Sequence, residues 1–210
     1  MATKQTLSEL AIKHGTDKAN GAHGYMRMYE KMLGTIEVNS LLEIGLGEGS
    51  SMKMFLEYYP NADIYCMENF GTENKKVWKE ATGEIEGLLL VSGDSSVPET
   101  WSSLPDNLSV IVDDGDHHPD VQIATFLLGF PHVRKGGLYC IEDLHCNWEK
   151  VYTGGKDVIY KWLFDLVISQ QTPGINWGGD FYKARAHMSD IAKQIYSYHF
   201  YKSCIIFEKA

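Results

Sequence analysis

The sequence predicts an α/β fold with a doubly wound, mostly parallel sheet of seven strands that ends in an antiparallel hairpin. Three observations support this class. Short apolar runs alternate with stretches of helical spacing from residue 40 to residue 170, which is the order of repeated βαβ units. A glycine-rich turn joins the first apolar run to the helical stretch after it. Near the C-terminus, two strand-like runs are separated by only two residues, too few for a crossover helix, so they pair antiparallel.

The elements follow in order from these patterns. Two N-terminal helices, joined by a polar loop, are expected at 5–14 and 24–34. Strands are predicted at 40–45, 63–68, 88–92, 108–113 and 137–142, with the hairpin at 194–200 and 203–207. Helices are predicted at 49–58, 72–82, 97–103, 118–130 and 156–170. The segment 171–187 is expected to be a long loop, and loops of this length in compact domains are often lids over a site.

Length and composition restrict the class of protein. The 210 residues suffice for one domain, which we divide into a helical lead-in at 1–36 and a sheet domain at 37–210. No apolar run reaches the roughly 18 residues of a membrane span, and the N-terminus lacks the apolar core of a secretory signal. The net charge of −9 argues against binding to nucleic acid. The four cysteines show no CxxC spacing, which indicates a reducing, cytoplasmic setting.

Two acidic doublets mark the ends of two predicted strands, Asp113-Asp114 and Glu142-Asp143. The helical stretch between them makes the two strands parallel, and neighbouring strands lie about 5 Å apart. Carboxylates crowded in this way repel one another unless a cation or protons offset the charge. The doublets therefore predict a site for a hard metal ion at this edge of the sheet, with His117 beside it. The alternative is a strand-end cluster that binds backbone amides.

A glycine-rich loop lies between the first strand and its helix. Gly45 and Gly47 let the backbone turn tightly and approach a ligand, while the helix presents free N–H groups. At the end of the second strand, Glu68 is placed to bind the ribose hydroxyls of an adenosine-containing ligand. Asp94 and Ser95 follow the third strand, where they could bracket an adenine amine. Taken singly, Glu68 could be a solvated strand end and Asp94 a helix N-cap.

The motif Glu43-x-Gly45-x-Gly47-x-Gly49, with an acidic second-strand end, resembles the class I methyltransferases that use S-adenosylmethionine. The stretches 111–118 and 130–143 are more specific. They resemble the metal-dependent sugar O-methyltransferases of the macrocin and mycinamicin type, whose pattern reads roughly V-D-D-G-S-H and then F-P-x-V-x-x-G-G-x-Y-x-x-E-D. The N-terminal stretch 10–25, which holds Lys18 and His23, is also similar to the lead-in of such proteins.

This resemblance implies a Rossmann-like methyltransferase fold and a set of roles. A divalent ion, usually Mg²⁺ with Mn²⁺ as an alternative, would bind to Asp114, Glu142 and Asp143. His117 would be the general base, and Asp113 would face the cofactor. The residues expected to contact S-adenosylmethionine are Glu43, Gly45, Gly47, Ser51, Glu68, Asp94, Ser95 and Asp113.

The acceptor implied by the resemblance is a sugar or glycoside with a vicinal diol, and our choice is the 2-hydroxyl of a 6-deoxyhexose such as rhamnose. Tyr25, His145 and Trp148 are candidates for the walls of its pocket, although plain packing explains them equally well. His118 adds a second imidazole, so the identity of the base stays open by one position. The long N-terminal oligomerising domain of the macrolide enzymes is absent, which leaves open a homo-oligomer or a piece of a larger glycan-building polypeptide.

Three rival functions remain. An NAD-dependent oxidoreductase is disfavoured by the position of the third glycine and by the final antiparallel hairpin. A catechol-type O-methyltransferase would use the same metal and a vicinal diol. A non-catalytic scaffold with this fold is disfavoured by the intact glycine loop and the intact acidic doublets.

Overall fold

The computed structural model describes residues 5–70, 85–153, 157–171 and 189–210. The helix expected at 72–82 lies outside these residues. So does the loop expected at 171–187, apart from Gln171, which ends a helix. No helix in the described part of the chain is both long enough and apolar enough to cross a bilayer.

The seven strands form one sheet in the order β3-β2-β1-β4-β5-β7-β6. Their bounds are β1 Ser40–Ile44, β2 Asp63–Glu68, β3 Leu88–Ser92, β4 Leu108–Asp113, β5 Val133–Ile141, β6 Ile195–Tyr201 and β7 Cys204–Lys209. The first five strands pair in parallel, and β7 pairs antiparallel with both β5 and β6. The predicted doubly wound sheet and its C-terminal hairpin are therefore confirmed.

Strand β5 differs from the prediction at its start. It begins at Val133 rather than at residue 137, and its pairing with β4 shifts register between Leu108 and Val110. Gly136 has a φ of +67°, a conformation that glycine adopts without steric cost. Residues 133–136 therefore belong to the strand, although the sequence pattern predicted that it starts at residue 137.

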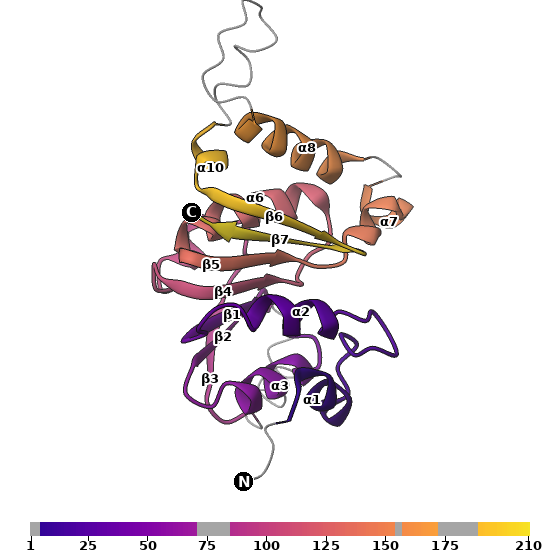
Figure 1. The fold of residues 1–210 in the computed structure, drawn as a ribbon, viewed down its shortest axis with the longest axis vertical. Coiled ribbons are helices and arrows are strands. Elements are labelled where there is room, and N and C mark those ends of the chain that lie inside the picture. The colour runs from indigo at the N-terminus through magenta and orange to yellow at the C-terminus, as the bar shows by residue number, and fades with distance from the viewer. Residues whose placement is uncertain (1–4, 71–84, 154–156, 172–188) are drawn as a thin grey trace, which may run out of the picture.

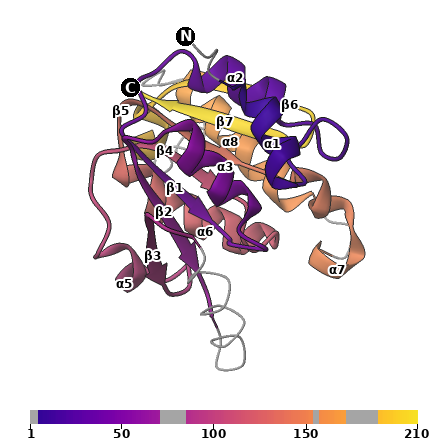
Figure 2. The ribbon, with the colours of Figure 1, turned by 90° about the horizontal axis from the view of Figure 1, so that it is seen from below.

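Helices cover both faces of the sheet, which separates them into two layers (Figure 1, Figure 2). The helices are α1 Leu7–His14, α2 Met26–Leu33, α3 Ser50–Tyr58, α5 Pro98–Trp101, α6 Pro119–Gly129, α7 Lys150–Thr153, α8 Val158–Gln171 and α10 Ser189–Lys193. Short 3-10 segments, η1 Phe130–His132 and η2 Leu144–Trp148, flank β5. The short segments α7, α10, η1 and η2 were not predicted.

Successive strand residues point to opposite faces of the sheet. In the first core cluster, Leu41 and Val110 pack with α1, α2 and α3. In the second, Leu42 and Ile111 pack with α6 and α8. This alternation decides which carboxylates at the ends of the strands share a face.

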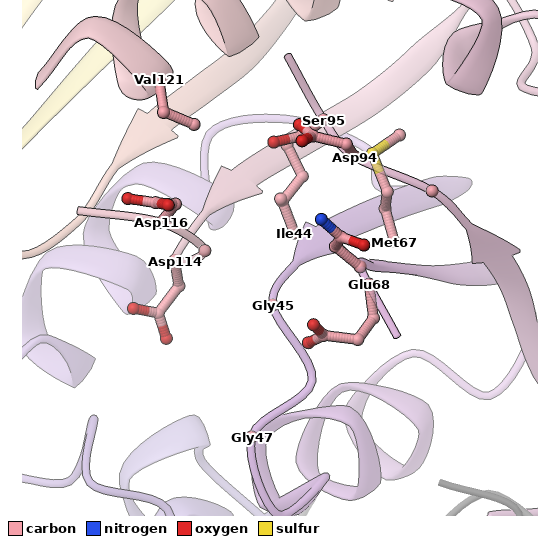
Figure 3. A pocket seen from close by; sticks show the side chains of 13 residues that line it. Ile44, Gly45, Gly47, Met67, Glu68, Asp94, Ser95, Asp114, Asp116 and Val121 are labelled. Carbon is pink, nitrogen blue, oxygen red and sulfur yellow. The ribbon is translucent and has the colours of Figure 1, made fainter. Parts of the chain in front are cut away.

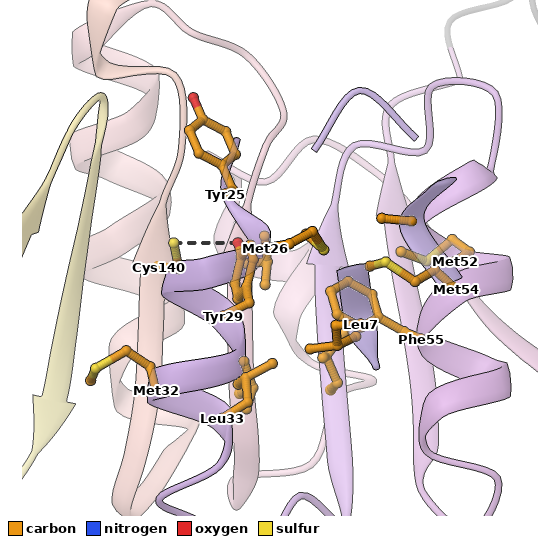
Figure 4. Packing of buried hydrophobic residues seen from close by; sticks show 14 of the residues in the cluster. Leu7, Tyr25, Met26, Tyr29, Met32, Leu33, Met52, Met54, Phe55 and Cys140 are labelled. Carbon is orange, nitrogen blue, oxygen red and sulfur yellow. Dashed lines mark hydrogen bonds between the residues drawn. The ribbon is translucent and has the colours of Figure 1, made fainter. Parts of the chain in front are cut away.

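The N-terminal helices pack on the first of these faces. Helix α1 starts at a capping box between Thr6 and Glu9, and its apolar side is buried. Tyr29 of α2 lies between the sheet and Phe55 of α3, and its hydroxyl oxygen is 3.4 Å from Cys140 Sγ (Figure 4). The loop between α1 and α2 is thereby held against the carboxyl ends of the central strands.

The tight approach of the glycine loop to β4 gives a test of the fold. Gly45 has a φ of +93°, and a Cβ at this position would lie 2.2 Å from the backbone oxygen of Asp114. We expect Gly45→Ala to lower the free energy of unfolding by about 3 kcal/mol or more, because strain and overlap add. Gly47→Ala is the matched control, since Gly47 has a φ of +50° and open space around it. It should cost only about 1–2 kcal/mol in urea unfolding, and equal losses would contradict the close approach.

Candidate functional site

Two cavities meet at the carboxyl edge of the central strands. The first, which we call the β2–β3 cavity, has a volume of about 500 Å³ and lies between the ends of β1 to β4. The second, the N-terminal cavity, has a volume of about 470 Å³ and lies between the α1–α2 loop and the start of α3. Gly45, Gly47 and Asp114 line both cavities. A ligand in one would therefore adjoin a ligand in the other.

The β2–β3 cavity collects most of the residues predicted to bind the cofactor. Glu68 and Asp94 lie on one side of Gly45, with Asp114 and Asp116 on the other (Figure 3). The carboxylate of Glu68 accepts a hydrogen bond from Leu46 N at 2.8 Å, which fixes it against the glycine loop.

Asp94 and Ser95 form the far wall of this cavity. Asp94 Oδ1 accepts hydrogen bonds from the backbone N of Ser96 at 2.8 Å and from its hydroxyl at 2.6 Å. Because α5 begins only at Pro98, with Val97 before it, Asp94 is a turn residue rather than the helix N-cap. Ser95 Oγ lies 2.9 Å from Thr125 Oγ1.

Two residues predicted to contact the cofactor lie outside these cavities. Asp113 is buried, and its carboxylate accepts a hydrogen bond from Tyr139 on the α6–α8 face of the sheet. Glu43 is fully buried on the opposite face. Neither residue lines either of the two cavities. The pleat explains both positions, because consecutive residues at a strand end point in opposite directions. Ser51 lines the N-terminal cavity rather than the β2–β3 cavity.

A buried lysine holds three carboxylates together. Lys18, in the α1–α2 loop, is 1% exposed. Its Nζ lies 2.5 Å from Asp114 Oδ2, 2.5 Å from Glu142 Oε2 and 3.2 Å from Glu43 Oε1. Tyr29 donates a second hydrogen bond to Glu142. The cation that the acidic doublets require is therefore supplied in part by the chain itself.

Burial shifts the pKa values of the groups at this edge. Burial lowers the pKa of Lys18, but Glu142, Glu43 and Asp114 outweigh burial and hold that pKa above its ordinary value. Burial raises the pKa of Glu43 to about 7 although Lys18 opposes the shift. The pKa of Asp113 also rises to about 7, mainly through burial. Burial therefore favours the neutral forms of Glu43 and Asp113, which lessens the repulsion among the carboxyls.

Asp143 lies among three histidines and a tyrosine. Tyr25 donates a hydrogen bond to Asp143 Oδ1 at 2.5 Å. His23 Nδ1 lies 3.8 Å and His145 Nδ1 3.9 Å from the same oxygen, and His117 Nε2 lies 3.9 Å from Oδ2. Asp143 has a φ of +54°, a left-handed conformation that Asp tolerates better than most residues. Its carboxylate is thereby the common neighbour of the polar side chains at this end of β5.

The structure separates the two candidate bases. His117 lines the N-terminal cavity together with Asp114 and Asp143. His118 is instead exposed at the start of α6, with Nδ1 2.6 Å from Asp116 Oδ1. His117 is therefore the better placed of the two.

Of the three residues predicted to line the acceptor pocket, two lie at the site and one does not. Tyr25 and His145 lie beside Asp143, as described above. Trp148 is 60% exposed, stacks on Tyr160 with ring centroids 5.3 Å apart, and lines neither cavity. The geometry gives Trp148 no direct link to the site.

The residues at this edge fit a hard divalent cation in part. Asp114 and Asp143 present carboxylates to the N-terminal cavity, and oxygen ligands are those that Mg²⁺ prefers. Glu142 is buried, and its oxygens contact Lys18 and Tyr29. Among the described residues, Asp114, Glu142 and Asp143 do not form a group of three ligand atoms within 4.8 Å of one another. Glu142 would join such an ion only by exchanging its contact with Lys18.

Sequence reasoning missed Lys18 and Tyr29 as partners of the acidic doublets. Lys18 is 96 residues from Asp114 in the chain, so no local pattern connects them. The available signal was indirect: a lysine in the lead-in motif, in a chain with an excess of carboxylates at predicted strand ends.

The buried contacts of Lys18 predict a large contribution of this residue to the free energy of unfolding. Lys18→Met leaves three carboxylates without their shared cation, so we expect the free energy of unfolding to fall by about 3–5 kcal/mol in metal-free buffer at neutral pH. Lys13→Met is the matched control, because Lys13 pairs with Glu57 at an exposed position and its removal should change little. Urea unfolding of both variants is the measurement, and comparable effects would contradict the central role of Lys18.

The sequence of the chain is similar to those of several known methyltransferases. No protein-family model matches the chain. L-olivosyl-oleandolide 3-O-methyltransferase of Streptomyces antibioticus is 28% identical over 160 residues, which cover 70% of this chain and 39% of that protein. Mycinamicin VI 2''-O-methyltransferase of Micromonospora griseorubida is 26% identical over 191 residues, covering 81% and 46% respectively. The chain therefore spans less than half the length of these curated relatives.

The fold is shared with a solved structure. The MycE methyltransferase of the mycinamycin biosynthetic pathway, in complex with Mg and SAH, superposes with a TM-score of 0.77 at 22% identity. The match covers 99% of this chain and 55% of that one. The resemblance inferred from the motifs is thereby confirmed: the chain has the class I methyltransferase fold, and its sequence relatives are sugar O-methyltransferases.

Proposed function

We propose that the chain is an S-adenosylmethionine-dependent and Mg²⁺-dependent O-methyltransferase that acts on a sugar hydroxyl within a vicinal diol. One observation carries the proposal. The β2–β3 cavity, with its glycine loop and strand-end acids, meets the N-terminal cavity, which holds Asp114, His117 and Asp143, at shared lining residues. A methyl donor and an acceptor hydroxyl could therefore be held in contact.

The relatives favour a sugar acceptor. Their names include a 2'-O-methyltransferase for 8-demethyl-8-alpha-L-rhamnosyl tetracenomycin-C and a 3-O-methyltransferase for L-olivosyl-oleandolide. A rhamnosyl unit carries neighbouring hydroxyls at its 2- and 3-positions, so a cation could chelate the 2-hydroxyl together with the 3-hydroxyl. We propose the 2-hydroxyl of a 6-deoxyhexose such as rhamnose, and residues 1–210 as one methyltransferase domain. Whether it acts alone, as a homo-oligomer or within a longer polypeptide does not alter this chemistry.

The β2–β3 cavity suits the donor. Bound S-adenosylmethionine would supply an electrophilic methyl group. The backbone at Gly45 and Gly47 lets the ligand approach closely, and the N-terminus of α3 lies next to it. Glu68 is positioned for ribose hydroxyls and Asp94 with Ser95 for the adenine, because ligands of such sheets lie across the carboxyl ends of the strands.

The N-terminal cavity suits the acceptor and a cation. A divalent ion at Asp114 and Asp143, with Glu142 as the third ligand, would lower the pKa of a chelated sugar hydroxyl. His117 accepts the hydroxyl proton at Nε2, which requires the proton of the neutral ring to be on Nδ1. The carboxylate of Asp143, 3.9 Å from that nitrogen, favours the imidazolium that forms. Much of the rate gain is positional, because the two cavities hold donor and acceptor side by side.

The direct test is a mass-spectrometric screen of 6-deoxyhexosides with S-adenosylmethionine and Mg²⁺. We expect a rhamnoside with free 2- and 3-hydroxyls to gain one methylene mass, and its 3-O-methyl derivative to react poorly because the diol is lost. EDTA should abolish turnover, and added Mg²⁺ should restore it. Methylation of catechol but of no sugar would point to the catechol-type enzyme, and turnover that survives EDTA would remove the metal from the proposal.

A pair of histidine variants tests the base. His117→Ala should lower turnover by about 10²–10⁴-fold, which is the usual loss when a general base is removed. His118→Ala is the matched control, because His118 is exposed and paired with Asp116, so its rate should stay near that of the unmodified chain. Both rates are measured with saturating donor. The reverse ranking would assign the proton transfer to His118.

A further inference from the structure

A group of imidazole and thiol side chains surrounds Asp143, and hard-cation chemistry does not explain it. Within 4.8 Å of one another lie ligand atoms of His23, Asp143 and His145. A second group combines His117, Asp143 and Cys146 within the same distance. Mg²⁺ prefers oxygen ligands, whereas imidazole nitrogen suits zinc and other late transition metals. Two of the three ligands in the first group are therefore of the wrong kind for the ion of the proposed reaction.

The first group already approaches the geometry of a zinc site. Asp143 Oδ1 is 3.8 Å from His23 Nδ1 and 3.9 Å from His145 Nδ1. Ligands at about 2.0–2.1 Å around a tetrahedral Zn²⁺ lie about 3.4 Å apart, so each imidazole–carboxylate distance needs to shorten by only about 0.5 Å. The ligand atoms of His23 and His145 lie within 4.8 Å of each other. The side chains of His23 and His145 are 33% and 45% exposed, which leaves them room to move and gives an ion a route from solvent.

The surroundings of this group support a bound cation. Tyr25 donates a hydrogen bond to Asp143 Oδ1 and points away from the apolar cluster beneath it (Figure 4). Such a donor behind a ligating carboxylate is typical of metal sites, where it fixes the orientation of the ligand. Ser203 Oγ lies 2.6 Å from His145 Nδ1 and is the contact that a cation at this nitrogen would replace. The three ligands come from two segments that the fold brings together: the α1–α2 loop holds His23, and the turn from β5 into η2 holds Asp143 and His145.

We propose that His23, Asp143 and His145 form a second cation site, which takes a borderline-soft divalent ion such as Zn²⁺. Three protein ligands leave a fourth position open to water. Asp143 belongs both to this site and to the proposed Mg²⁺ site, so occupation by Zn²⁺ excludes Mg²⁺ from a ligand that it needs. This competition rests on the proposed function, whereas the site itself does not.

The test is a measurement of Zn²⁺ affinity in competition with a chromophoric chelator, on the metal-free chain without donor or acceptor. We expect the unmodified chain to bind Zn²⁺, and His23→Ala and His145→Ala each to weaken binding by at least about tenfold. His132→Ala is the control, because His132 lies elsewhere, 3.1 Å from Asp106 Oδ1. His145→Gln keeps a polar side chain beside Ser203 and checks that a loss is not caused by misfolding.

Cobalt distinguishes this site from its thiol neighbour. Co²⁺ bound by two imidazoles and a carboxylate should show no thiolate-to-metal charge-transfer band, and Cys146→Ser should leave its affinity unchanged. A charge-transfer band that disappears in Cys146→Ser would assign the ion to one of the two groups that contain Cys146, with His117 and Asp143 or with His145 and Glu149, and would overturn the proposal. So would the absence of Zn²⁺ binding, or Zn²⁺ binding that neither His23→Ala nor His145→Ala weakens. None of these outcomes depends on methyl transfer, which the acceptor screen tests separately.

Discussion

The arrangement of the site depends on the ion pair network of Lys18. Its ammonium reaches Glu43 on β1 and the residues just beyond the ends of β4 and β5, Asp114 and Glu142. These carboxylates are brought together by the parallel pairing of the central strands, and they would repel one another in a buried setting. Lys18 offsets that repulsion from the face covered by α1, α2 and α3. The α1–α2 loop is therefore part of the electrostatics of the sheet edge and not only a lead-in to it.

Because side chains alternate in direction along a strand, the two acids of each doublet lie in different surroundings. Asp113 continues the side of β4 that faces α6 and α8, where it meets Tyr139. Asp114, the next residue, lies past the end of the strand and lines both cavities. Glu142 is buried against Lys18 and Tyr29, while Asp143 turns toward the N-terminal cavity through its left-handed backbone. Each doublet thus supplies one buried acid and one acid that lines a cavity.

The sequence was informative where the pattern is local. Apolar runs gave the strands, the short link at 201–204 gave the hairpin, and the doublets gave the acidic edge. The same period-two alternation could have placed Asp113 on the side of Ile111, outside both cavities. Contacts across the chain were beyond local patterns: Lys18 meets acids that lie far along the sequence. The irregular start of β5 was also missed, because its register shift depends on the pairing with β4.

A fixed cation and an exchangeable one can serve this edge together. Lys18 carries one positive charge, whereas five carboxylates are gathered at or near the strand ends: Glu43, Asp113, Asp114, Glu142 and Asp143. Burial raises the pKa of Glu43 and of Asp113 to about 7, so these two carboxyls are partly protonated at neutral pH and repel their neighbours less. Because the ammonium approaches from the α1–α3 face, Asp114 and Asp143 still line the N-terminal cavity. The tethered lysine thus pairs with the buried acids Glu43 and Glu142, while Asp114 and Asp143 present the carboxylates to which a cation from solvent could bind.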